Sequence, residues 1–304
     1  MKKILWKILD KLVRSLDRTM LDGCRKLIPI KIKRPLSRFL MKNIKLKSEY
    51  ITSNGGHKFK AISEPVFLQV VYDGEYEKDL SSVTRQLLRE GDNVIDVGAN
   101  FGWYSILMAD AIGAEGHVYS FEPNKNIYGV LEENVRINHY DKRVTIEKCG
   151  VGEKKKKAVL MAENQESGIG YFNTEGGAGS GEGESIEIRS LDDEFHDLVD
   201  SIAFIKIDVE GFEPFVLEGA QKILTSDNPP VMLMEFNIEA LERSNTNIDS
   251  FVRELGEYGA TAVVENGELK RLKEIKKENE NIFFFPKRGV FAERPKKLFM
   301  KNDV

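Results

Sequence analysis

The amino-acid sequence predicts a doubly wound α/β domain built on a mostly parallel, seven-stranded sheet. From residue 91 onward, short strand-like runs alternate with helical stretches, which is the pattern of parallel strands joined by helices. Several of these runs are almost continuously apolar, as expected for strands that helices cover on both faces. The chain has 304 residues, 41% of them hydrophobic and 31% charged, so it can form one large domain with an appendage.

The expected elements follow one another along the chain. Two alternating runs, 47–53 and 58–63, flank Asn54-Gly55-Gly56 and predict a hairpin. The second half of 72–90 is expected to be helical. The strands expected in the main sheet are 93–97, 117–121, 144–148, 203–207, 231–236, 260–264 and 282–285, and the main helices expected between them are 103–112, 124–138, 212–224 and 248–258. Ligands of such sheets bind beyond the carboxyl ends of the strands, so functional residues are expected there.

The composition divides the chain into four parts. They are a basic amphipathic arm at 1–47, a hairpin and helix at 48–90 expected to cap the ligand site, the main domain at 91–288, and a C-terminal tail at 289–304. The only cysteines, Cys24 and Cys149, exclude a disulfide scaffold and a Cys-rich zinc module, and they fit a reducing compartment. No run of about 18 apolar residues and no secretory signal is recognisable, so a cytoplasmic location is expected.

The N-terminal arm has a charge opposite to that of the body. Residues 1–47 carry 15 basic and three acidic side chains, a net charge of +12, whereas the remaining 257 residues carry −16. An amphipathic helix is expected over 2–21, with an apolar stripe at Leu5, Ile8, Leu9, Leu12, Val13 and Leu16. One interpretation is an anchor on an anionic membrane surface at the inner face of the membrane, or a dock for an anionic glycolipid. The alternative is a helix packed on the domain with a solvated basic face.

A glycine-rich stretch interrupts the main domain. Seven of the seventeen residues from Ser167 to Gly183 are glycine, and we expect residues 150–187 to form a mobile loop. Because it lies between the third and fourth core strands, it could be a substrate lid, and a plain flexible insertion is the alternative.

The first core strand leads into a glycine turn of unusual chemistry. Its sequence, Asp96-Val97-Gly98-Ala99-Asn100-Phe101-Gly102, lacks the Gly-x-Gly-x-x-Gly of a dinucleotide fold. The carboxylate before the first glycine opposes a pyrophosphate and suits a cationic ligand. Glu122 ends the second strand 26 residues later, where an acid can accept hydrogen bonds from both ribose hydroxyls. Together they favour S-adenosylmethionine, which carries a sulfonium, an ammonium and an adenosine.

The candidate cofactor-binding residues lie at the ends of the core strands. They are Asp96, Gly98, Ala99, Asn100, Gly102, Trp103, Glu122, Pro123, Asn124, Cys149 and Asp208. Trp103 or Tyr104 could face the sulfonium by cation–π attraction, and core packing is the alternative for both rings. Cys149 ends the third strand, where a packing role is the alternative to a ligand contact.

Four segments in order resemble the FkbM family of S-adenosylmethionine-dependent methyltransferases. They are residues 94–102 (VIDVGANFG), 118–124 (VYSFEPN), 205–213 (IKIDVEGFE) and 234–237 (MEFN), with weaker matches at 74–77 (GEYE) and 189–193 (RSLDD). The resemblance covers roughly residues 70–240. It implies a Rossmann-like class I methyltransferase fold and transfer of a methyl group, usually to an oxygen. Members of the family act on sugars, lipid-linked glycans and polyketide-type hydroxyls, so the resemblance does not name the acceptor.

Acidic side chains follow the fourth and fifth core strands. Methyl transfer requires the acceptor hydroxyl to lose its proton, and Asp208, Glu210 and Glu235 are the catalytic candidates, with Asp208 foremost. A divalent metal, Mg²⁺, Mn²⁺ or Ca²⁺, is the alternative device, held by Asp208, Glu235 and Asn237. Glu210 and Glu213 could instead cap the following helix.

The overall prediction is an O-methyltransferase of a hydroxyl on a sugar, glycolipid or other small molecule. One alternative is a catalytically inactive cofactor-binding protein of the same fold. Another is a nicotinamide-dependent oxidoreductase, against which the Asp96 turn argues. A nucleic acid methyltransferase is not expected, because the body is acidic.

Overall fold

The computed structural model describes residues 49–62, 70, 73–162, 170–173, 183–244, 246–275 and 281–299. The chain forms two compact units, residues 1–78 and 79–304. In the first, β1 (Tyr50–Thr52) and β2 (Lys58–Lys60) pair as an antiparallel hairpin, which confirms the hairpin predicted around Asn54. The arm at 1–47, including the predicted helix, lies outside the described residues. Within the described part of the chain, no helix is long and apolar enough to cross a membrane.

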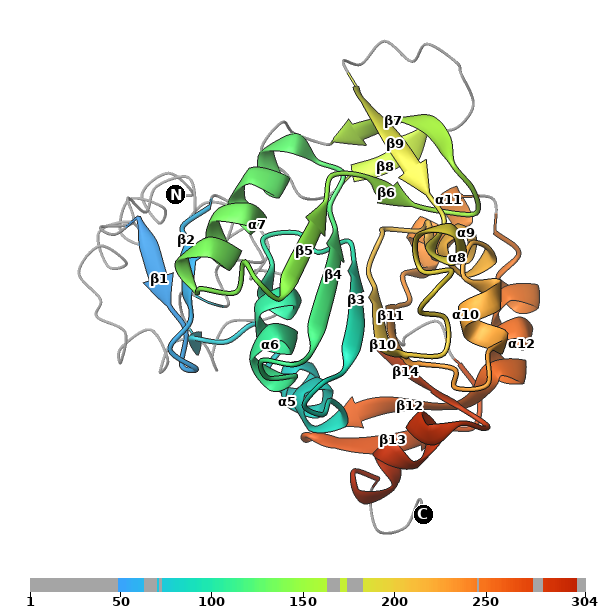
Figure 1. Ribbon diagram of the computed structural model, residues 1–304. Coiled ribbons are helices and arrows are strands. Elements are labelled where there is room, and N and C mark those ends of the chain that lie inside the picture. The colour runs from blue at the N-terminus through green and yellow to red at the C-terminus, as the bar shows by residue number, and fades with distance from the viewer. Residues whose placement is uncertain are drawn as a thin grey trace, which may run out of the picture. The chain divides into compact units, whose positions relative to one another are not determined.

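The second unit is built on an eight-stranded sheet (Figure 1). Its strand order is β13-β12-β14-β11-β10-β3-β4-β5. The bounds are β3 (Asn93–Val97), β4 (His117–Phe121), β5 (Val144–Glu147), β10 (Ile202–Ile207), β11 (Val231–Glu235), β12 (Gly259–Glu265), β13 (Glu268–Leu272) and β14 (Asn281–Pro286). The five strands from β11 to β5 run parallel to one another. The strands β14, β12 and β13 each pair antiparallel with their neighbours in the sheet. The predicted doubly wound, mostly parallel architecture is confirmed.

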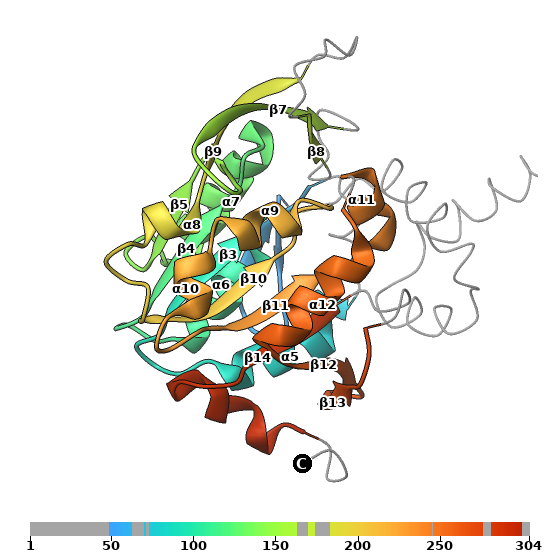
Figure 2. The ribbon, with the colours of Figure 1, turned by 90° about the vertical axis from the view of Figure 1, so that its right-hand side faces the viewer.

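Helices cover both faces of this sheet (Figures 1 and 2). On one side lie α6 (Trp103–Ala111), which packs on β3 and β4, and α7 (Lys125–Ile137), which packs on α6. On the other side, side chains of α8 (Leu191–Glu194), α9 (Glu213–Glu218), α10 (Gln221–Thr225) and α12 (Ile248–Tyr258) join one apolar core with β3, β10, β11 and β14. The remaining helices are α5 (Lys78–Leu87) and α11 (Ile238–Arg243). The opposite placement of the two layers follows from right-handed crossovers that run outward from β3 and β10 in opposite directions.

Two details differ from the sequence-based expectation. The single helix expected at 212–224 is broken into α9 and α10 at Gly219, where an added Cβ would lie 2.0 Å from the Gly152 carbonyl oxygen. The sheet has an eighth strand, β13, which a tight turn at Asn266 (φ 53°) and Gly267 (φ 81°) connects to β12. Both residues of that turn need a positive φ, which Asn and Gly tolerate best.

The C-terminal segment is part of the second unit. Residues Val290–Lys297 form the 3₁₀ helix η1, and Phe291 is buried. Arg294 donates two hydrogen bonds to the carboxylate of Asp92, at 2.5 and 2.7 Å, and a third to the carbonyl of Leu87. The expected tail is therefore anchored beside the start of β3.

The expectation of a loop at 150–187 is wrong for most of the residues that the structure describes there. Strands β6 (Gly150–Val151), β7 (Lys156–Ala162), β8 (Gly170–Asn173) and β9 (Glu184–Arg189) form a four-stranded sheet in the order β6-β9-β7-β8. Alternate residues of β7 and β9 are buried in a small apolar cluster made of Ala158, Leu160, Ile186 and Ile188. The high glycine content concealed this period-two pattern. Residues 163–169 and 174–182, which hold most of the glycines, lie outside the described residues.

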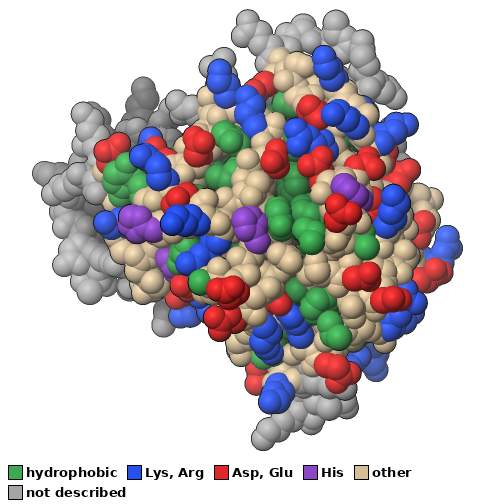
Figure 3. All heavy atoms as spheres, viewed as in Figure 1, with side chains coloured by type: hydrophobic (Ala, Val, Ile, Leu, Met, Phe, Trp, Pro, Cys, Tyr) green, Lys and Arg blue, Asp and Glu red, His purple; other side chains and the backbone are tan. Residues whose placement is uncertain are grey.

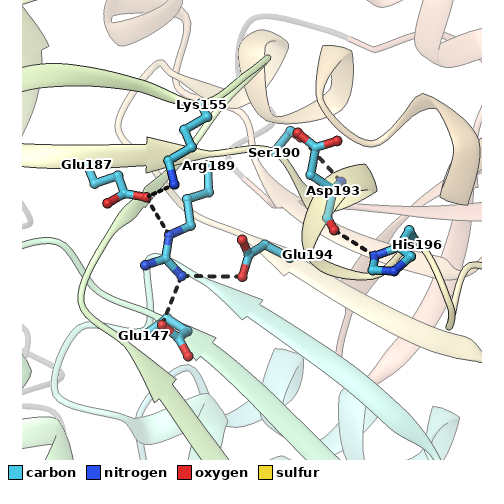
Figure 4. Close-up of polar contacts among 8 residues, drawn as sticks. All are labelled: Glu147, Lys155, Glu187, Arg189, Ser190, Asp193, Glu194 and His196. Atoms are coloured by element: carbon cyan, nitrogen blue, oxygen red, sulfur yellow. Dashed lines mark hydrogen bonds and ion pairs between the residues drawn. The ribbon is translucent and has the colours of Figure 1, made fainter.

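An arginine connects the four-stranded sheet to the main sheet and to α8 by ion pairs (Figure 4). Arg189, at the end of β9, donates to Glu147 at 3.1 Å, to Glu187 at 2.9 Å and to Glu194 at 3.3 Å. These partners belong to β5, β9 and α8 respectively. The arginine thereby links the main sheet, the small sheet and the helix that follows it.

Candidate active site

A narrow cavity lies at the carboxyl ends of the parallel strands. Its volume is about 50 Å³. The residues lining it are Val97, Gly98, Phe121, Glu122, Pro123, Asn124, Cys149, Gly150, Val151, Leu160, Asp208, Val209 and Glu210. Seven of the predicted site residues are among them, drawn from the ends of β3, β4, β5 and β10. Leu160 comes from the small sheet, so that sheet forms one wall. A nucleoside-sized ligand requires some of these side chains to shift.

The turn between β3 and α6 is held in left-handed backbone conformations. Gly98, Asn100 and Gly102 have φ values of 77°, 49° and 89°. A Cβ at Gly98 would lie 1.9 Å from the carbonyl oxygen of Asp208, so only glycine fits at that point. The buried Asn134 of α7 donates a hydrogen bond to the carbonyl of Phe101 at 2.8 Å and supports the turn from beneath. The sequence pattern placed this turn correctly, but it did not reveal its support by Asn134.

Glu122 joins the first two strand ends. Its Oε2 accepts a hydrogen bond from the backbone N–H of Asn100 at 2.9 Å, and its Oε1 accepts one from the N–H of Asn124 at 2.8 Å. Glu122 is buried, and burial raises the pKa of its carboxyl to about 7 despite these two hydrogen bonds. A carboxylate has about four acceptor positions, so two remain for a ligand in the cavity. This fits an acid that accepts hydrogen bonds from two ribose hydroxyls.

Asp96 lies in the interior of the sheet and does not line the cavity. In the register of the sheet it is flanked by Lys206 on β10 and Ser120 on β4. Ser120 Oγ donates to Ser105 Oγ at 2.9 Å, and Ser105 Oγ donates to Asp96 Oδ2 at 2.6 Å. Burial raises the pKa of Asp96, while Lys206 opposes this effect. Its second oxygen, Oδ1, is buried without a hydrogen-bond partner among the described residues.

Three ionisable groups meet where β10 and β11 end. The buried Lys206 Nζ donates a hydrogen bond to Asp208 Oδ2 at 2.8 Å. Asp208 also hydrogen bonds with Glu235. Burial alone would raise the pKa of Asp208, but Lys206 and this hydrogen bond lower it. Burial, followed by the charge of Asp208, raises the pKa of Glu235 to about 10. Lys206 therefore favours the charged form of Asp208, and burial beside that charge favours the neutral form of Glu235.

Several residues predicted to bind the cofactor instead pack within the protein or support the turn. Trp103 is buried, and its Nε1 donates a hydrogen bond to Ser81 Oγ at 2.9 Å, so the indole packs between α5 and α6 and does not line the cavity. The ring of Tyr104 lies 4.9 Å from the ammonium of Lys206, which is the cation it meets. Cys149 lines the cavity, and burial raises the pKa of its thiol to about 12, which keeps it neutral. Ala99 and Gly102 belong to the turn without lining the cavity.

The candidate metal ligands do not fit a metal centre. Asn237 Oδ1 accepts the N–H of Ala240 at 3.2 Å and caps α11. Asp208 is hydrogen bonded to Lys206, and burial raises the pKa of Glu235, which favours its neutral form. Among the described residues, no group of three or more His, Cys, Asp or Glu side chains is arranged to hold a metal ion.

Comparison with known families agrees with this geometry. The family described as the methyltransferase FkbM domain matches residues 96–258. The chain belongs to the FkbM methyltransferase family. The motifs at 94–102 and 205–213 predicted this family, and the matched residues include most of both motifs. The matched region contains the end of β3, all of β10 and β11, and every residue that lines the cavity.

Individual relatives of this FkbM methyltransferase are distant. A protein-L-isoaspartate O-methyltransferase from Ignicoccus hospitalis is 49% identical over 35 residues, which are 12% of this chain and 17% of that protein. The structure of an FkbM methyltransferase from Methylobacillus flagellatus is 19% identical with a TM-score of 0.43, and the alignment covers 65% of this chain and 44% of that one. An O-methyltransferase from Bacillus cereus, in complex with SAH, is 13% identical with a TM-score of 0.36, over 86% and 93% of the two chains. The chain thus spans less than half of the first structural relative and about a sixth of the sequence relative.

The residues of this FkbM protein fit S-adenosylmethionine at the cavity. Gly98 lets the backbone come close, and Glu122 keeps two acceptor positions. Sequence reasoning missed Leu160, which lines the cavity, and the polar residues behind this surface, namely Ser105, Ser120 and Asn134. A buried Ser or Asn within a helix or strand is the signal that could have found these three polar residues, because a buried polar side chain needs a partner.

Proposed function

We propose that this FkbM methyltransferase methylates a hydroxyl oxygen of a neutral sugar, a glycolipid or another small polyhydroxylated molecule. The observation that carries the proposal is the position of Asp208, which lines the cavity and has its Oδ2 2.8 Å from Lys206 Nζ, a contact that favours its charged form. An alcohol attacks a methyl group only as its proton leaves, and Asp208 is a carboxylate able to receive that proton at the edge of the cavity.

The site's own residues account for binding, orientation and charge. S-adenosylmethionine, when bound, supplies a methyl group already activated on its sulfonium. Glu122 would hold the ribose, with Asn124 and the turn at Gly98 beside it. Asp208 would accept the hydroxyl proton, and Glu235 would keep its own proton and hold Asp208 in place by donating a hydrogen bond to it. The apolar walls, Val97 and Leu160 among them, would keep water from competing as the acceptor.

The charge of the site supports a neutral acceptor. Asp208 and Glu210 line the cavity, Glu235 lies beside Asp208, and Lys206 is the cation already paired there. These carboxylates would repel a phosphate next to the reacting hydroxyl, so the site favours an uncharged acceptor. On the face drawn in Figure 3, acidic and basic side chains are interspersed, so that face offers no continuous cationic track for nucleic acid.

Calorimetry on the purified full chain is the first test. We expect S-adenosylmethionine to bind with micromolar affinity, equally with and without EDTA, and NADH to give no signal. Lack of S-adenosylmethionine binding in both conditions would end the proposal. A signal that EDTA abolishes would restore the metal alternative.

Methyl transfer is the second test. The protein is incubated with S-adenosylmethionine labelled in its methyl group and a panel of neutral glycosides, glycolipids and RNA. We expect label to appear in a glycoside or glycolipid. In Asp208→Asn this transfer should fall by roughly 10²–10⁴-fold, with little change in cofactor affinity. Asp197→Asn, an exposed acid, is the matched control. Label in RNA alone would contradict the proposal, and cofactor binding without transfer to any acceptor would favour the inactive binding protein.

We also propose that the basic arm binds an anionic membrane surface, which would place the enzyme at the inner face of the cytoplasmic membrane. The support is the +12 charge of residues 1–47 and the apolar stripe of 2–21. Deleting residues 1–28 should release the protein from phosphatidylserine vesicles while cofactor affinity stays unchanged. Equal sedimentation of both forms would refute the anchor.

A further inference from the structure

The segment between β10 and α9 carries the acids of the reacting end in a constrained backbone. Asp208, Val209 and Glu210 all line the cavity. Glu210 has a φ of 53° and Gly211 a φ of 100°, so two consecutive residues occupy the left-handed region. A non-glycine residue enters that region at a cost in free energy and stays there only when its surroundings hold it. Something must therefore hold the backbone around Glu210.

Two neighbours confine this segment from either side. A Cβ at Gly211 would lie 2.4 Å from the carbonyl oxygen of Ala240, so the backbone lies directly against α11. Before it, the N–H of Asp208 donates to the carbonyl of Val97 at 3.0 Å, and the Asp208 carbonyl packs against Gly98. These contacts fix the two ends of the segment. They do not explain what holds the backbone at Val209 and Glu210.

Glu213 supplies the missing support. Its Oε1 accepts hydrogen bonds from the N–H of Val209 and the N–H of Gly211, both at 3.2 Å. These two amides flank Glu210. Glu213 is 1% exposed, and its Oε2 is buried without a hydrogen-bond partner among the described residues. A buried carboxyl group is costly, so its retention here needs a reason.

We propose that Glu213 is a positioning residue, which holds the backbone of Val209 and Gly211 so that Asp208 and Glu210 face the cavity. The inference rests on the proposed function, because it assigns the presented acids to cofactor binding and methyl transfer. Glu213 touches neither the cavity nor any group proposed to react. Its role differs from the capping role that sequence alone suggested, because its two amide partners lie before α9 rather than within it.

Two substitutions separate the geometry of Glu213 from its charge. Glu213→Gln removes the charge but keeps an oxygen at the same reach, so it can still accept both amides. Glu213→Asp keeps the charge but shortens the side chain by one methylene, so its oxygen cannot reach both amides from the same backbone position. Glu218→Gln and Glu218→Asp, at an exposed position on the same helix, are the matched controls.

The readouts are amide hydrogen exchange at residues 208–211 and calorimetric affinity for S-adenosylmethionine, measured on the full chain. In Glu213→Asp we expect exchange at Val209 and Gly211 to quicken at least tenfold, with β3 and β10 unchanged, and cofactor affinity to fall about tenfold. In Glu213→Gln both quantities should stay within about threefold of the wild type. A purely structural role would quicken exchange throughout the unit in proportion to lost global stability, and that outcome overturns the proposal.

Other outcomes are equally decisive. The proposal is overturned if Glu213→Asp behaves as the wild type, or if Glu213→Gln is impaired while Glu213→Asp is not. If Glu213→Asp does not fold, Glu213→Gln is the test. Faster amide exchange at Val209 and Gly211 in a stably folded Glu213→Gln variant would contradict the proposal. If the wild type does not bind S-adenosylmethionine, the proposed function fails, yet the exchange measurement still decides whether Glu213 positions the segment.

Discussion

Lys206, the last residue but one of β10, places its ammonium 2.8 Å from the carboxylate of Asp208, which directly follows the same strand. Lys206 is almost fully buried, whereas Asp208 is partly exposed at the cavity. The pair therefore connects the interior of the sheet to its functional edge. It also favours the charged form of Asp208, because the ammonium of Lys206 lowers the pKa of the adjacent carboxyl.

Replacing Lys206 by Met should destabilise the protein in a pH-dependent way. Without the ammonium the pKa of Asp208 rises, and at neutral pH its charge is left beside Glu235 and Asp96. We expect a loss of about 1–3 kcal/mol in unfolding free energy near neutrality, and a smaller loss at acidic pH where Asp208 is protonated. Urea unfolding at both pH values measures this, with the exposed Lys222→Met as control. An equal loss at both pH values would show that packing, not charge, is responsible.

Removing the carboxyl of Glu122 should weaken cofactor binding. Glu122→Ala loses the acceptor for the ribose and also releases the N–H groups of Asn100 and Asn124, so we expect affinity for S-adenosylmethionine to fall at least tenfold. Calorimetry provides the measurement, and Glu132→Ala on the exposed side of α7 is the control. Unchanged affinity would remove Glu122 from the site.

A methyl group at Gly98 should reduce the stability of the protein far more than one at Gly91. Both glycines have a positive φ, at 77° and 82°. The added Cβ at Gly98 meets the Asp208 carbonyl at 1.9 Å, whereas at Gly91 nothing lies within 4 Å. Gly91→Ala should cost about 1 kcal/mol from backbone strain alone, and Gly98→Ala several kcal/mol together with loss of cofactor binding. Similar unfolding midpoints for the two variants would contradict the close approach.

Stability should fall as pH rises from about 4.5 to 7. Burial raises the pKa of Glu122 and of Glu213 to about 7 from an ordinary 4.5, so in this range the folded protein keeps protons that the unfolded chain releases. Binding more protons when folded means that unfolding becomes easier as pH increases. In Glu122→Gln the decline should be smaller by on the order of 2 kcal/mol, measured by urea unfolding at several pH values. An identical decline in both proteins would show that Glu122 titrates normally.

Local pattern predicted the main sheet well. The strands at 93–97 and 117–121 were placed to the residue, and the helix at 248–258 as well, because each is a single periodic run bounded by polar residues or turns. The small sheet was missed because β7 and β9 pair across a long glycine-rich interval, and pairing partners cannot be read from either strand alone.

The sequence by itself determined the fold class, the family and the set of acids at the strand ends, since these depend on periodicity and on short motifs such as 94–102 and 205–213. Only the tertiary structure decided what those residues do. Trp103 packs with its indole hydrogen bonded to Ser81, and the adjacent ammonium of Lys206 lowers the pKa of Asp208. Hydrogen bonds and electrostatic interactions act through space over a few ångströms, and residues distant in sequence, such as Asp208 and Glu235, become neighbours only when the chain has folded.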